Sequence, residues 1–323
     1  MSGTKIHDSV GSYSLDNHGI DFSTAEKVNA NLSDVTKVTF TRDPYTKIFS
    51  AHVDKIFPVS MPKVSTIIFS NTYQGNDTDV MKNPDMELLN ISFSATLQYA
   101  AGVFSDLSVV NEHFLPPSQI CDVCHINYDV IGKVETYNDD VEYILTSVNQ
   151  TRVFQSMGDI DANFEQRNII DVIFRTFRGL RKRKGQLGYS EEKRTLYSCA
   201  YQDGILRRMW KHFQIRGYLS DNTNFPITSK EESCSVQEPE LISMAFRALS
   251  QSEDRDVRRK QRHKYFVQAF KSVPLSVLKL FRNSVKLDCE LFGYDCSPPE
   301  IFDGRVDGDE EANIFTDLKY LYM

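Results

Sequence analysis

The sequence predicts an α/β fold, with a mostly parallel sheet flanked by helices and a largely helical C-terminal half. Three observations support this class. A short β-branched strand begins at Val35 and leads directly into an amphipathic helix. A second strand-like segment at Tyr128–Thr136 is again followed by a helical pattern. From Ile169 onward, apolar residues recur mostly at the three- and four-residue steps of helices.

The first strand, turn and helix occupy Val35–Phe57. The strand is rich in Val and Thr, and Pro44 ends it because proline cannot continue a ladder but suits the first helical turn. Asp43, directly before that proline, stands at the N-cap position. The helix then carries one apolar face, made of Tyr45, Ile48, Phe49, Val53, Ile56 and Phe57.

This segment has the layout of a phosphate-binding site. Arg42 lies at the turn and Ser50 lies two turns into the helix. Backbone amides at a helix start carry partial positive charge, a guanidinium binds phosphate through two hydrogen bonds, and a hydroxyl adds another. The alternative is structural, with Arg42 paired to Asp43 or to a surface carboxylate at the strand end. The spacing alone leaves both interpretations open.

The middle of the chain predicts a loop, a helix, a strand and a further helix. Residues 58–90 are rich in Pro, Gly and Asn and predict a loop-rich insertion, whereas residues 91–105 have the spacing of an amphipathic helix. Tyr128–Thr136 alternates small and branched residues about Ile131 and predicts a buried strand. Acidic residues then open a helix at Val141–Val148, where they complement the helix dipole.

Helices dominate the predicted C-terminal half. Ile169–Leu219 is helical by pattern but interrupted by glycines, with Arg181–Lys184 as a solvated charge run in a loop, and Asn222–Val236 resembles a linker. Further helices are predicted at Pro239–Ser250, Asp254–Ser272 and Pro274–Leu291.

Composition and charge limit the kind of partner. With 323 residues, 41% hydrophobic and 25% charged, the chain is typical of soluble globular proteins. Its net charge of −7 gives no general attraction to nucleic acid. The segment Arg175–Arg216, however, holds twelve Lys and Arg against three acidic residues. This local excess fits either a site for an anionic ligand or a solvated helix face.

The cysteines and the apolar runs of the sequence limit which metal sites and which membrane or targeting segments the chain can contain. The pair Cys121 and Cys124 fits half a zinc site, a redox pair or part of a disulfide set. Structural zinc usually requires a second close pair of Cys or His, and none has the right spacing, so disulfides or buried thiols are favoured over a metal. No run reaches the roughly 18 apolar residues of a membrane span, and the first 30 residues lack a signal-peptide core.

Three ordered segments resemble the Golgi carbohydrate sulfotransferases of the HNK-1 and chondroitin/dermatan type. TRDPYTKIFSAHVDKIF, from Thr41 to Phe57, resembles their 3′-phosphate-binding segment, with His52 where an aromatic is usual. His113–Thr136 resembles their HW-x-P…C-x-x-C…YD-x-IGK-x-ET segment, and Leu287–Asp295 resembles their closing DF-x-LFGY segment. The likeness runs from about residue 35 to about residue 302.

The resemblance implies a P-loop-like sheet and sulfate transfer from 3′-phosphoadenosine-5′-phosphosulfate to a glycan hydroxyl, without a metal. It implies that Arg42 and Ser50 bind the 3′-phosphate of this donor. His113 lies in a family-like segment and is the candidate catalytic base, although the residues alone favour a structural histidine there; Glu135 is a poorer candidate. The implied partner is a glycan or glycosaminoglycan rather than a nucleic acid, and the implied location is the Golgi lumen or membrane.

One family segment has no counterpart here. The family's P-K-x-G loop, which cradles the 5′-phosphosulfate, matches nothing between Met1 and Thr41, and Pro62-Lys63-Val64 lacks the glycine. We therefore expect a sulfotransferase-like domain at residues 35–302 that is incomplete at its N-terminus, after a weakly ordered lead-in at 1–34 and before an acidic tail at 303–323. A membrane anchor is expected to be absent from this chain. The alternative is a non-catalytic nucleotide- or glycan-binding relative.

Overall fold

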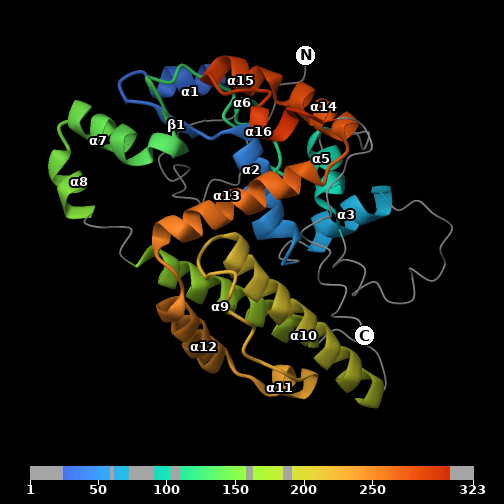
Figure 1. Cartoon of the computed structure of the whole chain (residues 1–323). Coiled ribbons are helices and arrows are strands. Elements are labelled where there is room, and N and C mark those ends of the chain that lie inside the picture. Colours follow the sequence, from blue (N-terminus) through green and yellow to red (C-terminus); the bar gives the residue numbers. More distant parts are fainter. Residues whose placement is uncertain are drawn as a thin grey trace. The chain divides into compact units, whose positions relative to one another are not determined.

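The computed structural model describes residues 25–58, 62–72, 91–102, 110–157, 163–184 and 191–305 (Figure 1). The chain divides into two compact units. The first unit comprises Met1–Ile48, Asp106–Gly158 and Arg282–Cys296, and the second comprises Phe49–Ser105, Asp159–Phe281 and Ser297–Met323. The boundary falls inside helix α2 (Pro44–Ala51), between Ile48 and Phe49.

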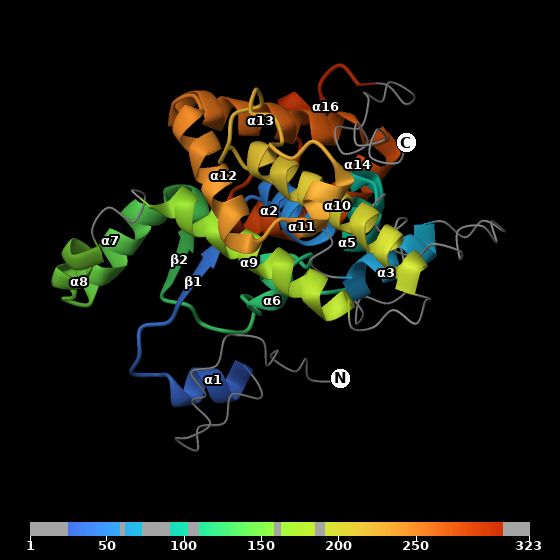
Figure 2. The same cartoon turned by 90° about the horizontal axis from the view of Figure 1, so that it is seen from below.

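The first unit contains the sheet. Strands β1 (Val38–Thr41) and β2 (Val130–Lys133) pair in parallel, with Val38 opposite Val130 and Thr41 opposite Lys133 (Figure 2). This confirms the predicted α/β class. A Cβ on Gly132 would lie 2.5 Å from the ring of Phe40, so a larger residue there would require that ring to move. The expectation that β2 is buried was wrong for Ile131, which is 46% exposed.

Short helices surround this sheet in the first unit. Val28 of the first helix packs on Ile126, with Leu32 and Tyr128 partly buried beside them. The acidic start predicted for the helix after β2 is present, because Asp140 accepts hydrogen bonds from the Lys133 amide at 2.7 Å and from the Thr136 hydroxyl at 2.8 Å. The helices are α1 (Ala25–Asn31), α6 (Pro117–Ile120), the 3-10 helix η6 (Val134–Thr136), α7 (Tyr137–Ser147), α8 (Thr151–Met157) and α15 (Lys286–Phe292).

The second unit is helical throughout its described part. An apolar cluster lies where α9, α10 and α12 pack together (Figure 1), and it includes the fully buried Ile169, Leu206 and Leu241. The helices are the π-helix η2 (His52–Ile56), α3 (Pro62–Thr72), α5 (Phe93–Ala100), α9 (Phe164–Lys184), α10 (Glu191–Ile215), α11 (Lys230–Ser235), α12 (Glu238–Gln251), α13 (Arg255–Lys271) and α16 (Pro299–Phe302). Helix α14 (Leu275–Ser284) crosses the boundary between the units.

The predicted strand, turn and helix at the start of the fold are confirmed. Asp43 caps α2, since its Oδ1 accepts a hydrogen bond from the Thr46 amide at 2.7 Å. The six predicted apolar positions from Tyr45 to Phe57 are each at most 2% exposed. After Ala51 the helix widens into the π-helix η2, a change that sequence periodicity does not announce.

Three predicted loops contain helix instead. Residues 62–72 form α3, because Pro62 occupies the first turn, where proline is tolerated, and Val64 and Ile68 are buried. Arg181–Lys184 end α9, which continues through Gly179, and α11 lies inside the predicted linker. The remainder of the predicted insertion, residues 73–90, lies outside the described residues, as do 1–24 of the predicted lead-in and 306–323 of the predicted tail.

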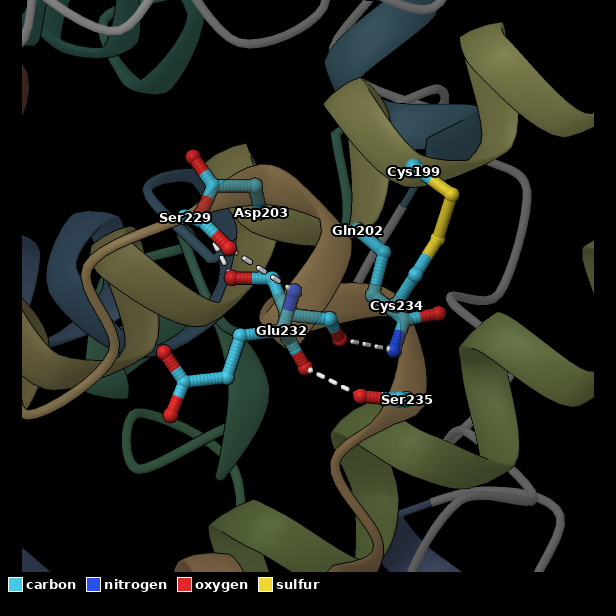
Figure 3. The surroundings of a disulfide bond; sticks show 8 residues. Cys199, Gln202, Asp203, Ser229, Glu232, Cys234 and Ser235 are labelled. Carbon is cyan, nitrogen blue, oxygen red and sulfur yellow. Dashed lines mark hydrogen bonds between the residues drawn. A yellow bond between two sulfur atoms is a disulfide. The ribbon is translucent and has the colours of Figure 1, made fainter.

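Four of the six cysteines form disulfides. Cys199 of α10 is bonded to Cys234 of α11, within the second unit (Figure 3), and Cys289 is bonded to Cys296 within the first. Cys121 and Cys124 are both free thiols. In the part of the chain that the structure describes, no helix is both long and apolar enough to cross a lipid bilayer.

Candidate functional site

Arg42 lies in the turn between β1 and α2, at the carboxyl end of β1 in the first unit. The turn is fixed by Asp43, whose side chain caps α2 and whose backbone N–H donates to Glu135 Oε1 at 2.9 Å. Burial raises the pKa of Asp43 despite the hydrogen bond from Thr46. The guanidinium of Arg42 thus belongs to a turn that is held on both sides.

The same carboxylate joins a third segment to this turn. Glu135 Oε2 accepts a hydrogen bond from the hydroxyl of Tyr294 at 3.1 Å, and the Lys133 ammonium lies 4.8 Å from the centre of the Tyr294 ring. Burial and the negative charge of Glu135 both raise the pKa of Tyr294. Residues from the three family-like segments, Asp43, Glu135 and Tyr294, therefore meet at one place. The sequence alone did not reveal this contact.

The loop that carries His113 is clamped by two buried charged groups of the first unit. The Lys47 ammonium donates to the carbonyl of Leu115, and Asp288 Oδ1 accepts from the Ser118 amide at 2.8 Å. Burial lowers the pKa of Lys47 to about 8, while the nearby Asp288 carboxylate opposes that change. Burial raises the pKa of Asp288, which is 0% exposed. His113 itself is half-buried, and its amide donates to Asn111 Oδ1 at 3.1 Å.

Ser50 lies in the second unit, where it is 7% exposed. Its Oγ accepts a hydrogen bond from Arg216 Nη1 at 2.8 Å and donates one to Asp54 Oδ2 at 3.3 Å. Asp54 belongs to the π-helix η2, one turn after Ser50. The predicted phosphate-binding serine is thus already engaged by a guanidinium that the sequence reasoning did not assign to it.

His212 completes this group. Its Nε2–H donates to Asp54 Oδ1 at 3.0 Å, and Arg216 Nε lies 3.6 Å from the same oxygen. Burial opposes ionisation of Asp54, but the hydrogen bond from His212 and the charge of Arg216 outweigh it and hold the pKa of Asp54 well below its usual range. Burial lowers the pKa of His212, so this histidine is neutral. The cluster therefore carries one carboxylate and one guanidinium.

Comparison with known proteins identifies the family. The sequence model of the sulfotransferase family matches residues 6–214 of this chain. The chain belongs to the sulfotransferase family. Carbohydrate sulfotransferase 12 of Xenopus laevis is 32% identical over 133 residues, which cover 38% of this chain and 31% of that relative. Carbohydrate sulfotransferase 11 of Danio rerio is 27% identical over 128 residues, covering 38% and 35% respectively.

The chain spans about a third of the length of these curated relatives. No solved structure matches it. The described residues of the chain contain no group of three or more His, Cys, Asp or Glu side chains placed to hold a metal ion.

The two predicted phosphate-binding residues lie in different units, Arg42 in the first and Ser50 in the second. Sequence reasoning missed Arg216 and His212, which lie 166 residues after Ser50 and 158 residues after Asp54. One signal pointed toward them, since Arg216 is the last residue of the basic segment from Arg175. Cationic and hydroxyl donors around Ser50 are the groups that a phosphate monoester requires. The Arg216 guanidinium and the Ser50 hydroxyl are therefore groups of the kind that bind an anion.

Proposed function

We propose that this protein is a carbohydrate sulfotransferase that transfers sulfate from 3′-phosphoadenosine-5′-phosphosulfate to a glycan hydroxyl. The observation that carries the proposal is the meeting of Asp43, Glu135 and Tyr294, one from each of the three ordered family-like segments. The Glu135 carboxylate thus brings the three segments, which are far apart in the sequence, together in one place. Family membership and the names of the matched relatives support the same reaction class.

In this proposal Arg42 and Ser50 each bind the 3′-phosphate. The turn holding Arg42 precedes the start of α2, where partial positive charge favours an anion. Ser50 supplies a hydroxyl on the same helix. Their role is to hold the donor nucleotide and to select it over adenosine phosphosulfate, which lacks the 3′-phosphate. Neither residue takes part in the bond changes.

The donor nucleotide supplies the sulfuryl group, and sulfuryl transfer requires the attacking and leaving oxygens to be held in line. A base accepts the proton of the glycan hydroxyl as its oxygen bonds to sulfur, and this step is typically worth 10²–10⁴-fold. We assign the base to His113. The loop that follows it is hydrogen-bonded by Lys47 at Leu115 and by Asp288 at Ser118.

The proposed setting is the Golgi lumen, and the proposed acceptor is a glycan or glycosaminoglycan. Two disulfides support an oxidising compartment, because such bonds persist in secretory proteins and are rare in the cytosol. The net charge of −7 gives no support for nucleic acid as a partner.

The test compares binding of 3′,5′-ADP to the wild-type protein and to Arg42→Gln by calorimetry. We expect Arg42→Gln to bind at least tenfold more weakly, since charge-assisted hydrogen bonds are worth about 1.5–3 kcal/mol. Arg152→Gln, on the exposed start of α8 in the same unit, should bind like the wild type. Equal affinity of Arg42→Gln and wild type would refute the site.

Transfer is tested separately, with labelled donor and with chondroitin, dermatan or a glucuronyl-capped glycan as acceptor. Sulfate transfer that Arg42→Gln and His113→Ala both reduce would support the full proposal. Binding of 3′,5′-ADP without any transfer would instead identify a non-catalytic nucleotide-binding member of the family.

A further inference from the structure

The guanidinium of Arg216 contacts Ser50, and the proposed function gives it no role. It lies just after α10, and its direction is fixed by the way that helix ends. Gly217 adopts a φ of +70°, and a Cβ there would lie 2.7 Å from the carbonyl oxygen of Arg258, so only glycine fits. Arg258 Nη1 in turn donates to the carbonyls of Gly217 at 2.8 Å and of Tyr218 at 2.9 Å. The backbone directly after Arg216 is therefore fixed by the conformation of Gly217 and by the hydrogen bonds from Arg258.

The hydrogen bonds of Arg216 are unusual for an arginine whose only task is to pair with a carboxylate. Its Nη1 donates to the neutral hydroxyl of Ser50 at 2.8 Å, while the Asp54 carboxylate is contacted only through Nε, at 3.6 Å. An arginine that serves a carboxylate alone prefers a two-bonded fork, which is stronger. The guanidinium of Arg216 instead points its Nη1 at the Ser50 hydroxyl.

One donor of this guanidinium, Nε, has no acceptor within hydrogen-bonding distance, since Asp54 Oδ1 lies 3.6 Å away. Arg216 Nε is buried and makes no hydrogen bond with the described residues. A buried donor left without an acceptor costs roughly 1–3 kcal/mol, so such groups call for an explanation. The side chains of Arg216 and Asp54 are 15% and 34% exposed, so the cluster can be reached from solvent. An anionic oxygen arriving there would meet both a guanidinium and a hydroxyl.

We infer that Arg216, together with Ser50, binds the 3′-phosphate of the donor nucleotide, and that Asp54 and His212 keep its guanidinium in place before the nucleotide arrives. This inference rests on the proposed function, because it names a further ligand for the same phosphate. It uses residues of the second unit alone. Arg216 is thus a specificity-determining residue that separates nucleotides with a 3′-phosphate from those without one.

The test measures two ligands on each variant: 3′,5′-ADP and 5′-AMP, which differ only by the 3′-phosphate. Arg216→Gln should lose at least tenfold in affinity for 3′,5′-ADP and little for 5′-AMP. Arg216→Lys keeps the charge without the fork and should show an intermediate loss, again confined to 3′,5′-ADP. The control is Arg259→Gln, whose side chain is 71% exposed on α13 and pairs with Asp256, and it should match the wild type for both ligands.

Thermal unfolding shows whether Arg216→Gln is folded. If it is not, the comparison is made with Arg216→Lys instead. In a double-mutant cycle with Ser50→Ala, the losses for 3′,5′-ADP should be less than additive, since both residues serve one phosphate. Equal losses for 3′,5′-ADP and 5′-AMP would show a merely structural role and overturn the inference. Suppose that the wild type binds 3′,5′-ADP, that Arg42→Gln weakens this binding, and that folded Arg216 variants bind as tightly as the wild type. In that case only the inference about Arg216 fails, and the proposed function stands. If wild type binds no 3′,5′-ADP, the proposed function fails first.

Discussion

The carboxylate of Glu135 accepts a hydrogen bond from the backbone N–H of Asp43 at 2.9 Å and a second from the Tyr294 hydroxyl at 3.1 Å. Glu135 follows β2, Asp43 starts α2, and Tyr294 follows α15. One side chain thereby connects three segments, since Asp43 lies 92 residues before Glu135 and Tyr294 lies 159 residues after it. This arrangement gives the acidic residue a structural role at this position, because it fixes the turn that carries Arg42.

Replacing Glu135 with Ala should lower the free energy of unfolding by about 1 kcal/mol, since two hydrogen bonds at a solvent-exposed position are lost. It should also weaken binding of 3′,5′-ADP, because the Arg42 turn becomes less fixed. Glu135→Gln keeps an acceptor oxygen and should cost less. Urea unfolding measures the change, with Glu142→Ala on the exposed face of α7 as control, expected within about 0.5 kcal/mol of wild type. Equal effects at positions 135 and 142 would contradict this role.

Lys47 and Asp288 should behave as a coupled pair. Lys47→Met leaves a buried carboxylate without its nearby cation, and Asp288→Asn leaves a buried ammonium, so each change should cost about 3 kcal/mol of stability. The double variant should cost at least 1 kcal/mol less than the sum, because it leaves no uncompensated charge. Denaturant unfolding of all four proteins gives this coupling free energy, and strictly additive losses would show that the two groups act independently.

Local sequence signals predicted the local structure well. Asp43 before Pro44 marked the helix start, and apolar spacing marked the buried face from Tyr45 to Phe57. The same reasoning failed at Pro62, because proline both breaks a helix and suits its first turn, and only the buried Val64 and Ile68 decide between these outcomes.

The candidate site shows the other limit of sequence reasoning. Arg42 and Ser50 share one short motif, so the pattern found them. Arg216 reaches Ser50 only through the packing of α10, and His212 reaches Asp54 the same way. Such contacts depend on tertiary structure and produce no periodic pattern in the sequence. The basic segment indicated an anionic ligand or a solvated face, and it gave no means of choosing which of its twelve basic residues lies beside the serine.

The disulfide between Cys199 and Cys234 should stabilise the second unit more than Cys289–Cys296 stabilises the first. It closes 35 residues rather than 7, and in the chain-entropy model the corresponding contributions are about 4 and about 2 kcal/mol. Neighbouring hydrogen bonds, such as Gln202 Nε2 to the Ser233 carbonyl at 2.6 Å (Figure 3), do not involve the sulfurs and should remain in the paired variant. Paired Cys→Ala variants compared by denaturant unfolding test the order, and a larger loss for the shorter loop would contradict it.

His52 should make stability depend on pH. It is fully buried against Thr96 and Phe93, and burial, aided by the charge of Arg208, lowers its pKa to about 3. The unfolded chain, with a histidine pKa near 6.5, therefore binds a proton between pH 6.5 and pH 3 that the folded protein does not. The free energy of unfolding must then fall as pH is lowered through this window, by about 1.4 kcal/mol per pH unit for this one group.

His52→Phe should remove that contribution, because phenylalanine does not titrate and an aromatic residue suits a site that contacts the Phe93 ring. Unfolding by urea at pH values from 7 to 4 should show a shallower decline for the variant than for wild type. The matched control is His125→Gln: Asp122 raises the pKa of that exposed histidine, so both folded and unfolded states bind its proton below pH 6 and the slope stays unchanged. Parallel curves for His52→Phe and wild type would show that His52 is not held neutral by the fold.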